Sequence, residues 1–347
     1  MKYSKTFIFS ALLFTFALVI IIIDLQPVWS TYRPDGQTIE ITAAKLDGFD
    51  PDDTAETSFG KLTFLGGLEL NSNERWFGGF SGLIVSPDGK KLTAVSDRAL
   101  WFTADLVQAK NGAPLKLTNA YMEPMDGIGK TALASTDKSD TEALTVDGKG
   151  RLLVSYEGYG GILAYKYKAN GKLAAPEDLS VPQDLHMLEK NKGIEALAYA
   201  PRGSIHAGSV FALSERSGSS TDDRLAYEIN LEHPARSNKF IIKDIDGYDI
   251  TDAAFLPNGD LIFLERQIGI SVGLNFRMRR IAAKDIKPGA EVTGDVLLDV
   301  GMSKRIDNFE ALAIHSDQNG DAILTLLSDD NHNMIQRTLL LRFKLAM

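Results

Sequence analysis

The sequence predicts an all-β fold: a β-propeller of five or six four-stranded blades, preceded by an N-terminal hydrophobic helix. One phrase recurs five times, namely an acidic or small polar residue, an apolar strand, a glycine-containing turn, a second apolar strand and a further acid. The copies start at positions 81, 142, 195, 252 and 310, and a period of this size indicates a repeat array. No long amphipathic helix interrupts the pattern, so each repeat resembles a propeller blade made of strands alone.

The first 30 residues predict a targeting segment. Lys2 and Lys5 precede an uncharged, largely apolar run over residues 6–23, which ends at Asp24. The run is close to the about 20 residues that span a bilayer, and longer than the roughly 7–15 residues of a secretory signal core. We therefore expect an uncleaved signal anchor, with a cleaved signal peptide as the alternative. Either one places the rest of the chain outside the cytoplasm, in the periplasm or at the cell surface.

Two further regions follow the targeting segment. Residues 31–58 are predicted to be a linker with a first strand near 38–43, and residues 59–347 to form the propeller. Turn signals such as Pro87-Asp88-Gly89 and Pro257-Asn258-Gly259 separate paired apolar runs and indicate hairpins. Segment 38–80 either completes a blade together with a C-terminal strand at 338–344 or forms much of a sixth blade.

The composition excludes several classes of function. The 347 residues include no cysteine, which rules out disulfides, thiolate nucleophiles and zinc–thiolate sites. A net charge of −9 argues against a nucleic-acid partner. The chain has no Gly-x-Ser-x-Gly elbow, no phosphate-binding loop and no His-Glu-x-x-His motif. We expect a monomer whose only membrane contact is the N-terminal segment and whose metal sites use oxygen or imidazole ligands.

The acids of the repeat are predicted to meet at one end of the propeller. In an antiparallel hairpin the start of the first strand and the end of the second lie side by side. The acids that this rule pairs are Glu142 with Glu157, Glu195 with Glu215, Asp252 with Glu265 and Glu310 with Asp329, whereas the first copy has Ser81 and Asp97. Because the blades surround one axis, all these ends should emerge on one rim of the central channel.

So many like charges require neutralisation, for which a hard cation such as Ca²⁺ and the nearby arginines are candidates. The predicted metal ligands are Asp97, Glu142, Glu157, Glu195, Glu215, Asp252, Glu265, Asp307, Glu310 and Asp329. The predicted substrate-binding residues are Arg98, Arg216, Arg266 and Asn331, since a guanidinium can bind an anion with two hydrogen bonds. The alternative for any single acid or arginine is a structural fastener between blades.

The last copy is the richest in polar side chains. Its segments 307–310 (DNFE) and 328–333 (SDDNHN) should meet at one hairpin end. The predicted catalytic residues are Glu310, Asp329, Asp330 and His332. A lone histidine is more often structural or exposed than catalytic, and that alternative stays open for His332.

Several of these segments resemble a known family, the phytase-like domain described as having esterase-like activity. They are 78–83 (GGFSGL), 94–98 (AVSDR), 191–197 (NKGIEAL), 264–266 (LER), 307–312 (DNFEAL) and 327–331 (LSDDN). The resemblance covers about residues 60–345. It implies an exported bacterial protein related to calcium-dependent β-propeller phytases, in which acids hold Ca²⁺, the ions bind phosphate and activate water, and arginines contact phosphate oxygens.

These observations together lead us to expect an exported, Ca²⁺-dependent hydrolase that acts on a small anionic substrate, with a phosphate ester as the first candidate. A metal-dependent lactonase or carboxylesterase is one alternative. The other is a non-catalytic binding module whose propeller is stabilised by Ca²⁺.

Overall fold

The computed structural model describes residues 36–157, 160–183, 185, 193–215 and 223–347. The predicted N-terminal hydrophobic helix and Arg216 lie outside the described residues. Within the described part of the chain, no helix is long and apolar enough to cross a membrane. The strands there are joined by turns and by three-residue 3-10 segments such as Ile128–Lys130 and Ala283–Asp285, so the all-β prediction is confirmed.

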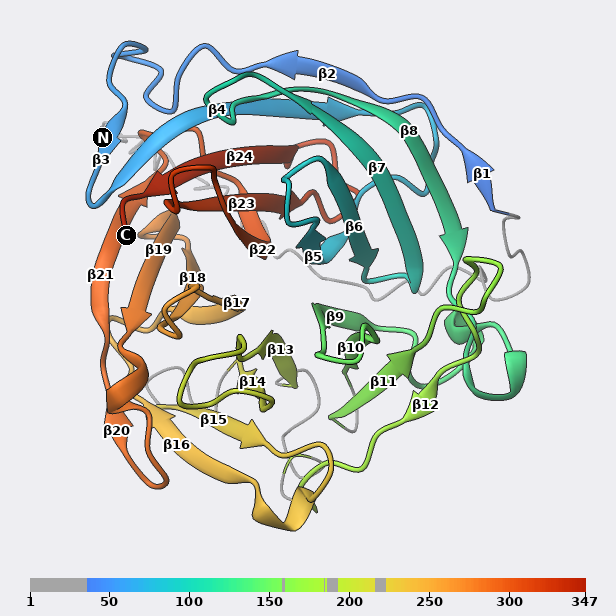
Figure 1. Ribbon diagram of the computed structural model, residues 1–347. Coiled ribbons are helices and arrows are strands. Elements are labelled where there is room, and N and C mark those ends of the chain that lie inside the picture. Colours follow the sequence, from blue (N-terminus) through green and yellow to red (C-terminus); the bar gives the residue numbers. More distant parts are fainter. Residues whose placement is uncertain (1–35, 158–159, 184, 186–192, 216–222) are drawn as a thin grey trace, which may run out of the picture. The chain divides into compact units, whose positions relative to one another are not determined.

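The described strands form five sheets, which are the blades of the propeller (Figure 1). Blade 1 contains β5 (Phe80–Val85), β6 (Lys91–Ser96), β7 (Leu100–Gln108), β8 (Pro114–Pro124) and β1 (Gln37–Thr38). Blade 2 contains β9 (Thr141–Val146), β10 (Leu152–Tyr156), β11 (Gly161–Tyr165) and β12 (Glu177–Asp178). Blade 3 contains β13 (Ile194–Tyr199), β14 (Val210–Ser214), β15 (Arg224–Ile229), β16 (Asn238–Ile242) and β20 (Glu291–Val292).

Blade 4 contains β17 (Asp249–Phe255), β18 (Leu261–Gly269), β19 (Gly273–Ile281) and β21 (Asp295–Gly301). Blade 5 contains β22 (Asn308–Ser316), β23 (Ala322–Asp329), β24 (Thr338–Leu345), β4 (Leu62–Asn71), β2 (Thr42–Lys45) and β3 (Ser58–Phe59). Each blade thus has the four antiparallel strands that the repeat predicts, and the described residues add short outer strands to blades 1, 3 and 5.

The first strand of each blade lies innermost, and these five strands close a ring. Each of β5, β9, β13 and β17 contacts the first strand of the next blade, and β22 contacts β5. Figure 1 shows the same arrangement in a view down the ring axis. The described residues therefore form a propeller of five blades, and the alternative of six blades is excluded.

The ring is closed by the two ends of the described chain. The N-terminal strand β4 pairs antiparallel with the C-terminal strand β24, with Leu70 opposite Thr338 and Leu68 opposite Leu340. This confirms the prediction that segment 38–80 completes a blade with the C-terminal strand. Blade 5 is therefore held together by strands that are far apart in the sequence.

The core of the propeller consists of apolar clusters between neighbouring blades. Between blades 4 and 5, for example, Ile262 and Leu264 pack in one cluster with Leu312 and Leu324. Strands covered on both faces are apolar along their whole length. This explains why β10 is buried at every position. It also explains why β10 lacks the alternation of apolar and polar residues that marks a strand with one exposed face.

Candidate functional site

A β-bulge near the start of each first strand sets one side chain apart. In every blade the first strand starts, and the second strand ends, at the same end of the propeller. We call this end the site end. In blade 5, Phe309 pairs with Ser328 and Ala311 with Leu327, which leaves Glu310 unpaired. A bulge interrupts the ladder and can re-aim a side chain. The bulged residues of blades 1, 3, 4 and 5 are Ser81, Glu195, Thr251 and Glu310, and in blade 2 the bulge contains Glu142 and Ala143.

The residue that ends each second strand lies beside the start of the first strand. The backbone N–H groups of Asp97 and Glu157 donate to the carbonyl oxygens of Gly79 and Asp140, each at 2.9 Å. Four blades carry an acid at this position, namely Asp97, Glu157, Glu215 and Asp329. The hairpin rule therefore holds for these blades, and it brings Glu142 next to Glu157 as predicted.

The acids of different blades converge on the ring axis. Burial, and then the charges of neighbouring carboxylates that include Glu310 of blade 5, raise the pKa of Glu142 in blade 2 and of Glu195 in blade 3. Blade 5 adjoins neither of these blades in the ring, so the side chains meet across the axis. We call this group the acidic ring: Asp97, Asp140, Glu142, Glu157, Glu195, Glu215, Glu310 and Asp329.

Burial and mutual repulsion keep several carboxyls of the acidic ring protonated near neutral pH. Burial, together with the surrounding carboxylates, raises the pKa of Asp97 to about 7. Burial and the charge of Glu310 raise the pKa of Asp329 to about 9. Burial and the carboxyl of Asp140 raise the pKa of Glu157 to about 7. The ring therefore holds more acids than the nearby positive charges can compensate.

Three of these carboxyls form a compact group of oxygen donors. Asp140, Glu142 and Glu157 each present a carboxylate oxygen, and the three oxygens lie within 4.8 Å of one another. Asp140 is absent from the residues predicted by the repeat. The signal that could have found it is the Asp-x-Glu spacing at 140–142, since alternate residues of an extended chain share one side.

Blade 4 departs from the pattern by one residue. Its ladder pairs Asp249 with Arg266, at the position where that of blade 5 pairs Asn308 with Asp329. Arg266, and not Glu265, therefore occupies the place of the second acid. Because a shift of one residue turns a strand's side chains to the opposite face, the acid pair predicted for blade 4 is not brought to the ring.

The guanidinium of Arg266 is instead embedded in the acidic ring. Its Nη1 donates to Oδ1 of Asn308 at 2.6 Å and also to a carboxylate oxygen of Glu310, and its Nη2 lies 3.8 Å from Glu215. Burial opposes the charge of Arg266, but the carboxylates of Glu310, Glu215 and Glu195 outweigh this effect and raise its pKa. Arg266 thus neutralises part of the ring, rather than presenting an open anion site.

Asp252 and Glu265, both predicted as metal ligands, have structural partners away from the ring. Asp252 is buried, and its Oδ2 accepts the backbone N–H of Leu312 at 2.6 Å, which fastens blade 4 to blade 5. Glu265 is also buried and accepts the Nε–H groups of Arg277 at 2.7 Å and Arg279 at 2.8 Å. The physical reason in both cases is that these acids lie one residue away from the positions that face the ring, in a ladder with the same register as that of blade 5.

The polar segments of blade 5 mostly organise the loop between β23 and β24. Asp307 accepts the backbone N–H and the Nε–H of Arg337 at 3.1 and 3.2 Å. Asp330 accepts the N–H groups of Gly79 and His332 at 3.2 and 3.0 Å through one oxygen and a hydroxyl of β24 through the other. Both carboxyls are therefore occupied by the protein, and they orient the loop beside the ring.

Three polar atoms at the site end of blades 1 and 5 are buried without a hydrogen-bond partner among the described residues, namely Oγ of Ser81, Nε2 of His332 and Oδ1 of Asp97. The last two lie against Gly79, whose positive φ of 63° and missing side chain give them room. Burial lowers the pKa of His332 and favours its neutral imidazole. Asn331, a predicted substrate contact, is exposed and donates its amide to Gln336 at 3.2 Å.

Arg98 is the predicted anion-binding arginine that the structure leaves open. It is exposed next to Asp97, and its side chain forms no ion pair with the described residues. Its charge also contributes to the lowered pKa of His332, after burial. Arg216, the third predicted arginine, lies outside the described residues.

The acidic ring fits a hard cation such as Ca²⁺. Such an ion takes about 6–8 oxygen ligands from carboxylates, carbonyls and water. The ring offers carboxylates on several blades, the compact group of Asp140, Glu142 and Glu157, and the unpartnered Oδ1 of Asp97. The raised pKa values have the same physical origin, since the carboxylates lack a compensating positive charge.

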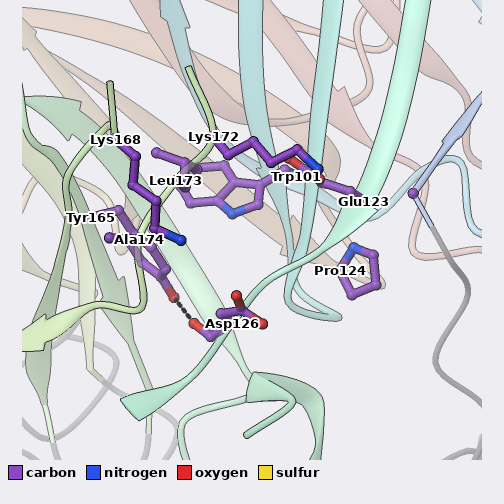
Figure 2. Close-up of a pocket in the computed structure, with 10 residues that line it drawn as sticks. Trp101, Glu123, Pro124, Asp126, Tyr165, Lys168, Lys172, Leu173 and Ala174 are labelled. Carbon is purple, nitrogen blue, oxygen red and sulfur yellow. Dashed lines mark hydrogen bonds between the residues drawn. The ribbon is translucent and has the colours of Figure 1, made fainter. Parts of the chain in front are cut away.

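A separate cavity of about 420 Å³ lies where blades 1 and 2 meet (Figure 2). Trp101 and Tyr165 form part of its wall, and the Tyr165 hydroxyl donates to the carbonyl of Asp126 at 2.9 Å. Two lysines and Glu123 also line it, as does Gly36, where the described chain begins. None of the residues predicted as site residues borders this cavity.

One protein-family model matches most of the chain. It is described as "Phytase-like: Esterase-like activity of phytase" and matches residues 75–332 of 347, a span that contains the whole acidic ring. No curated protein gives a significant match.

Solved structures with low sequence identity are also similar to the chain. A luciferin-regenerating enzyme is 12% identical, with a TM-score of 0.42 and coverage of 78% of this chain and 95% of that one. A putative gluconolactonase is 11% identical, with a TM-score of 0.40 and coverage of 89% and 94%. A virginiamycin B lyase from Staphylococcus aureus is 11% identical, with a TM-score of 0.38 and coverage of 83% and 85%.

Proposed function

Because the chain belongs to the phytase-like family described by its esterase-like activity, we propose that it is a Ca²⁺-dependent ester hydrolase that acts at the acidic ring. Its proposed substrate is a small phosphate monoester. The observation that carries the proposal is the convergence of carboxyls from four blades on one axis, with three of their oxygens within 4.8 Å of one another.

The proposed metal ligands are centred on Asp140, Glu142 and Glu157, with Glu195 nearby. When bound, Ca²⁺ would polarise the ester and favour deprotonation of an attacking water. The expected location outside the cytoplasm fits this assignment. Calcium-binding modules that function outside the cell need only weak binding, with dissociation constants of about 10⁻⁴–10⁻³ M.

Two further carboxyls of the ring are suited to proton transfer. Asp329, whose pKa is about 9, holds a proton at neutral pH that it can donate to a leaving oxygen. Asp97, whose pKa is about 7, can accept one. Glu310 is held by Arg266, and its negative charge acts both on these two groups and on the proposed ligands Glu142 and Glu195.

Arg98 is the proposed contact for the phosphate oxygens, because it is exposed beside the acidic ring and forms no ion pair with any residue that the structure describes. A guanidinium binds phosphate with two parallel hydrogen bonds. His332 and Asp330 are assigned a supporting role: the loop that carries them lies on Gly79 and borders Asp97.

One observation favours a second substrate class. Among the described residues near the axis, carboxyls outnumber arginines, and an excess of negative charge repels a phosphate more than a neutral ester. A carboxylic ester or lactone is therefore the alternative substrate. A non-catalytic module that binds Ca²⁺ for stability is the alternative outside enzymes.

The test is hydrolysis by the full chain with saturating Ca²⁺ or with a chelator, on p-nitrophenyl phosphate, p-nitrophenyl acetate and a γ-lactone. We expect Ca²⁺-dependent turnover of the phosphate ester, and a loss of at least about tenfold in Ca²⁺ affinity in Glu142→Gln. Asp285→Asn, an exposed acid at the opposite end, is the matched control and should change neither.

Turnover of the acetate or the lactone alone would replace the phosphate ester by the second substrate class. Calcium binding with no turnover of any ester would favour the non-catalytic binding module over the hydrolase. If chelation changes neither turnover nor melting temperature, the assignment of the acidic ring as a metal centre is wrong.

A further inference from the structure

Large apolar side chains are concentrated in the loops at the site end of blades 4 and 5. Of the six most exposed large apolar residues in the described chain, five lie there, with Ile270 and Met334 fully exposed and Ile335 exposed by 91%. We call this group the apolar rim: Ile268, Ile270, Val272 and Met302 on blade 4, and Met334 and Ile335 on blade 5. Exposed apolar groups gathered in this way mark an interaction surface.

Two of the three loops that form the apolar rim are uncharged, although the chain as a whole carries a net charge of −9; the third, which carries Met302, also contains Lys304, paired with Asp50 at 2.7 Å, and Arg305. The hairpin of β18 and β19 reads QIGISVGLN over residues 267–275, and the loop after β23 reads NHNMIQ over 331–336. Met302 packs on the hairpin, since its sulfur lies 3.0 Å from the point that a Cβ on Gly273 would occupy. An uncharged apolar tip of this kind can enter a lipid interface without burying a charge.

The rim also projects beyond the acidic ring. Ile270 follows Arg266 by four residues along β18 and the turn, which corresponds to about 13 Å along an extended strand. The tips can therefore contact a flat apolar layer while the carboxyls at the axis stay in water. This separation matters, because charged carboxylates would oppose insertion if they lay at the same depth.

The described chain begins at the same end of the propeller. Strand β7 leaves the site end and β8 returns to it, so that β8 finishes there at Pro124. Gln37 pairs with Met122 near that finish, and Gly36 lies beside it at the cavity of Figure 2. Only residues 24–35 separate this point from the apolar run at 6–23, and twelve residues span at most about 40 Å.

From these observations we infer that the propeller docks on a lipid bilayer with its site end, through the apolar rim. A bilayer is the occupant that suits both the uncharged tips and a short connection to a membrane-length apolar segment. Peripheral apolar groups of this kind are buried roughly 5–10 Å into the boundary between headgroups and acyl chains. The inference is independent of whether the acidic ring hydrolyses an ester.

The absence of cysteine allows a direct test with the full chain. Single variants Ile270→Cys and Ile335→Cys are labelled with an environment-sensitive fluorophore and reconstituted into phosphatidylcholine vesicles with or without brominated acyl chains. Ile205→Cys is the matched control, because Ile205 is exposed by 72% in the loop between β13 and β14 at the opposite end. All three positions are exposed, so that none of the variants disturbs the core.

We expect brominated lipid to quench the labels at 270 and 335 by about twofold or more and to leave the label at 205 unchanged, as interfacial burial requires. A blue shift in emission should accompany the quenching. If all three labels respond alike, the N-terminal segment holds the protein near the bilayer without any preferred face, and the inference is overturned. It is equally overturned if only the label at 205 is quenched.

Discussion

The carboxyls of the acidic ring show how a fold can hold side chains in a protonation state that water would not favour. Asp329 is buried among other acids, and folding raises its pKa to about 9. Its charged form is therefore the unfavourable one in the metal-free protein. A cation bound at the neighbouring carboxylates weakens this preference, because its positive charge stabilises the charged form of Asp329.

We predict, first, that the metal-free protein loses stability as the pH rises from about 4 to about 9. Asp97 and Asp329 have pKa values of about 7 and about 9 in the fold, above the ordinary aspartate value near 3.8. In this range the folded state binds more protons than the unfolded state, so that the free energy of unfolding falls with rising pH. Melting temperatures in a chelator at about pH 5, 7 and 9 measure it.

Two controls sharpen this measurement. Saturating Ca²⁺ should flatten the decline, because the positive charge of the bound ion stabilises the ionised forms of the nearby Asp97 and Asp329 carboxyls. Asp329→Asn should flatten it without Ca²⁺, because the variant has no proton to lose at this position. A melting temperature that rises with pH in the chelator would contradict the electrostatic description of the ring.

At the scale of elements, the hairpin is the unit that carries the chemistry, and its register decides which side chain faces the axis. Blade 4 shows the effect of one residue. Arg266 contacts the acidic ring, and its sequence neighbour Glu265 turns to the opposite face and pairs with Arg277 and Arg279. The same strand thus supplies a counter-charge to the site and an ion cluster to the sheet.

The second prediction separates these two roles. Glu265→Gln should lower the free energy of unfolding by about 3–5 kcal/mol, because it leaves the buried Arg279 without a carboxylate and leaves the buried Arg277 with only the exposed Asp246, at 3.5 Å. Ca²⁺ affinity, measured by calorimetry, should stay the same. Loss of Ca²⁺ binding in a variant with unchanged stability would instead return Glu265 to the metal ligands.

The third prediction concerns the arginine of the ring. Arg266→Met should destabilise the protein in a chelator by about 1–3 kcal/mol and much less with Ca²⁺, because the cation replaces the lost positive charge. Arg280→Met, which breaks the pair with Asp260 at the opposite end, is the control. It should cause the same loss in urea denaturation with and without Ca²⁺. Equal effects of Ca²⁺ on both variants would contradict the assigned role of Arg266.

The sequence predicts the hairpins well, because period, turn residues and apolar runs are local signals. The neighbouring positions of Glu142 and Glu157 follow directly from them. The register of blade 4 could not be read in the same way. There the order Asp252-Ala253 imitates the Glu-Ala of the other copies one residue late, and only the ladder of β17 and β18 reveals the shift. Asp140 was missed because it precedes the repeated phrase.

In the molecule as a whole, the closure of the ring by β4 is the feature on which stability depends most. Strand β4 completes blade 5 and is itself largely buried, with Leu62, Phe64, Leu68 and Leu70 all in the core. Full burial of one such side chain contributes about 1.5–3 kcal/mol. Four of them together are comparable to the whole stability of an ordinary domain, about 5–15 kcal/mol.

The fourth prediction is that this strand is indispensable. A chain that starts at Arg33 contains the complete propeller unit and should melt in one cooperative transition. A chain that starts at Ser72 lacks β4 and should show no such transition by circular dichroism. If the shorter chain melts cooperatively within a few degrees of the longer one, closure by β4 does not hold the ring together.

The pairing of β4 with β24 also imposes an order in time. Strand β4 is synthesised before its partner β24, which begins 276 positions later when counted from Leu62 to Thr338. At about 5–20 residues per second, a ribosome needs roughly 15–55 s to make that stretch. Throughout this interval blade 5 has no closing partner, so the nascent propeller stays open until β24 has been synthesised. A prematurely terminated chain never closes, and its unpaired strand edges distinguish it from the finished protein.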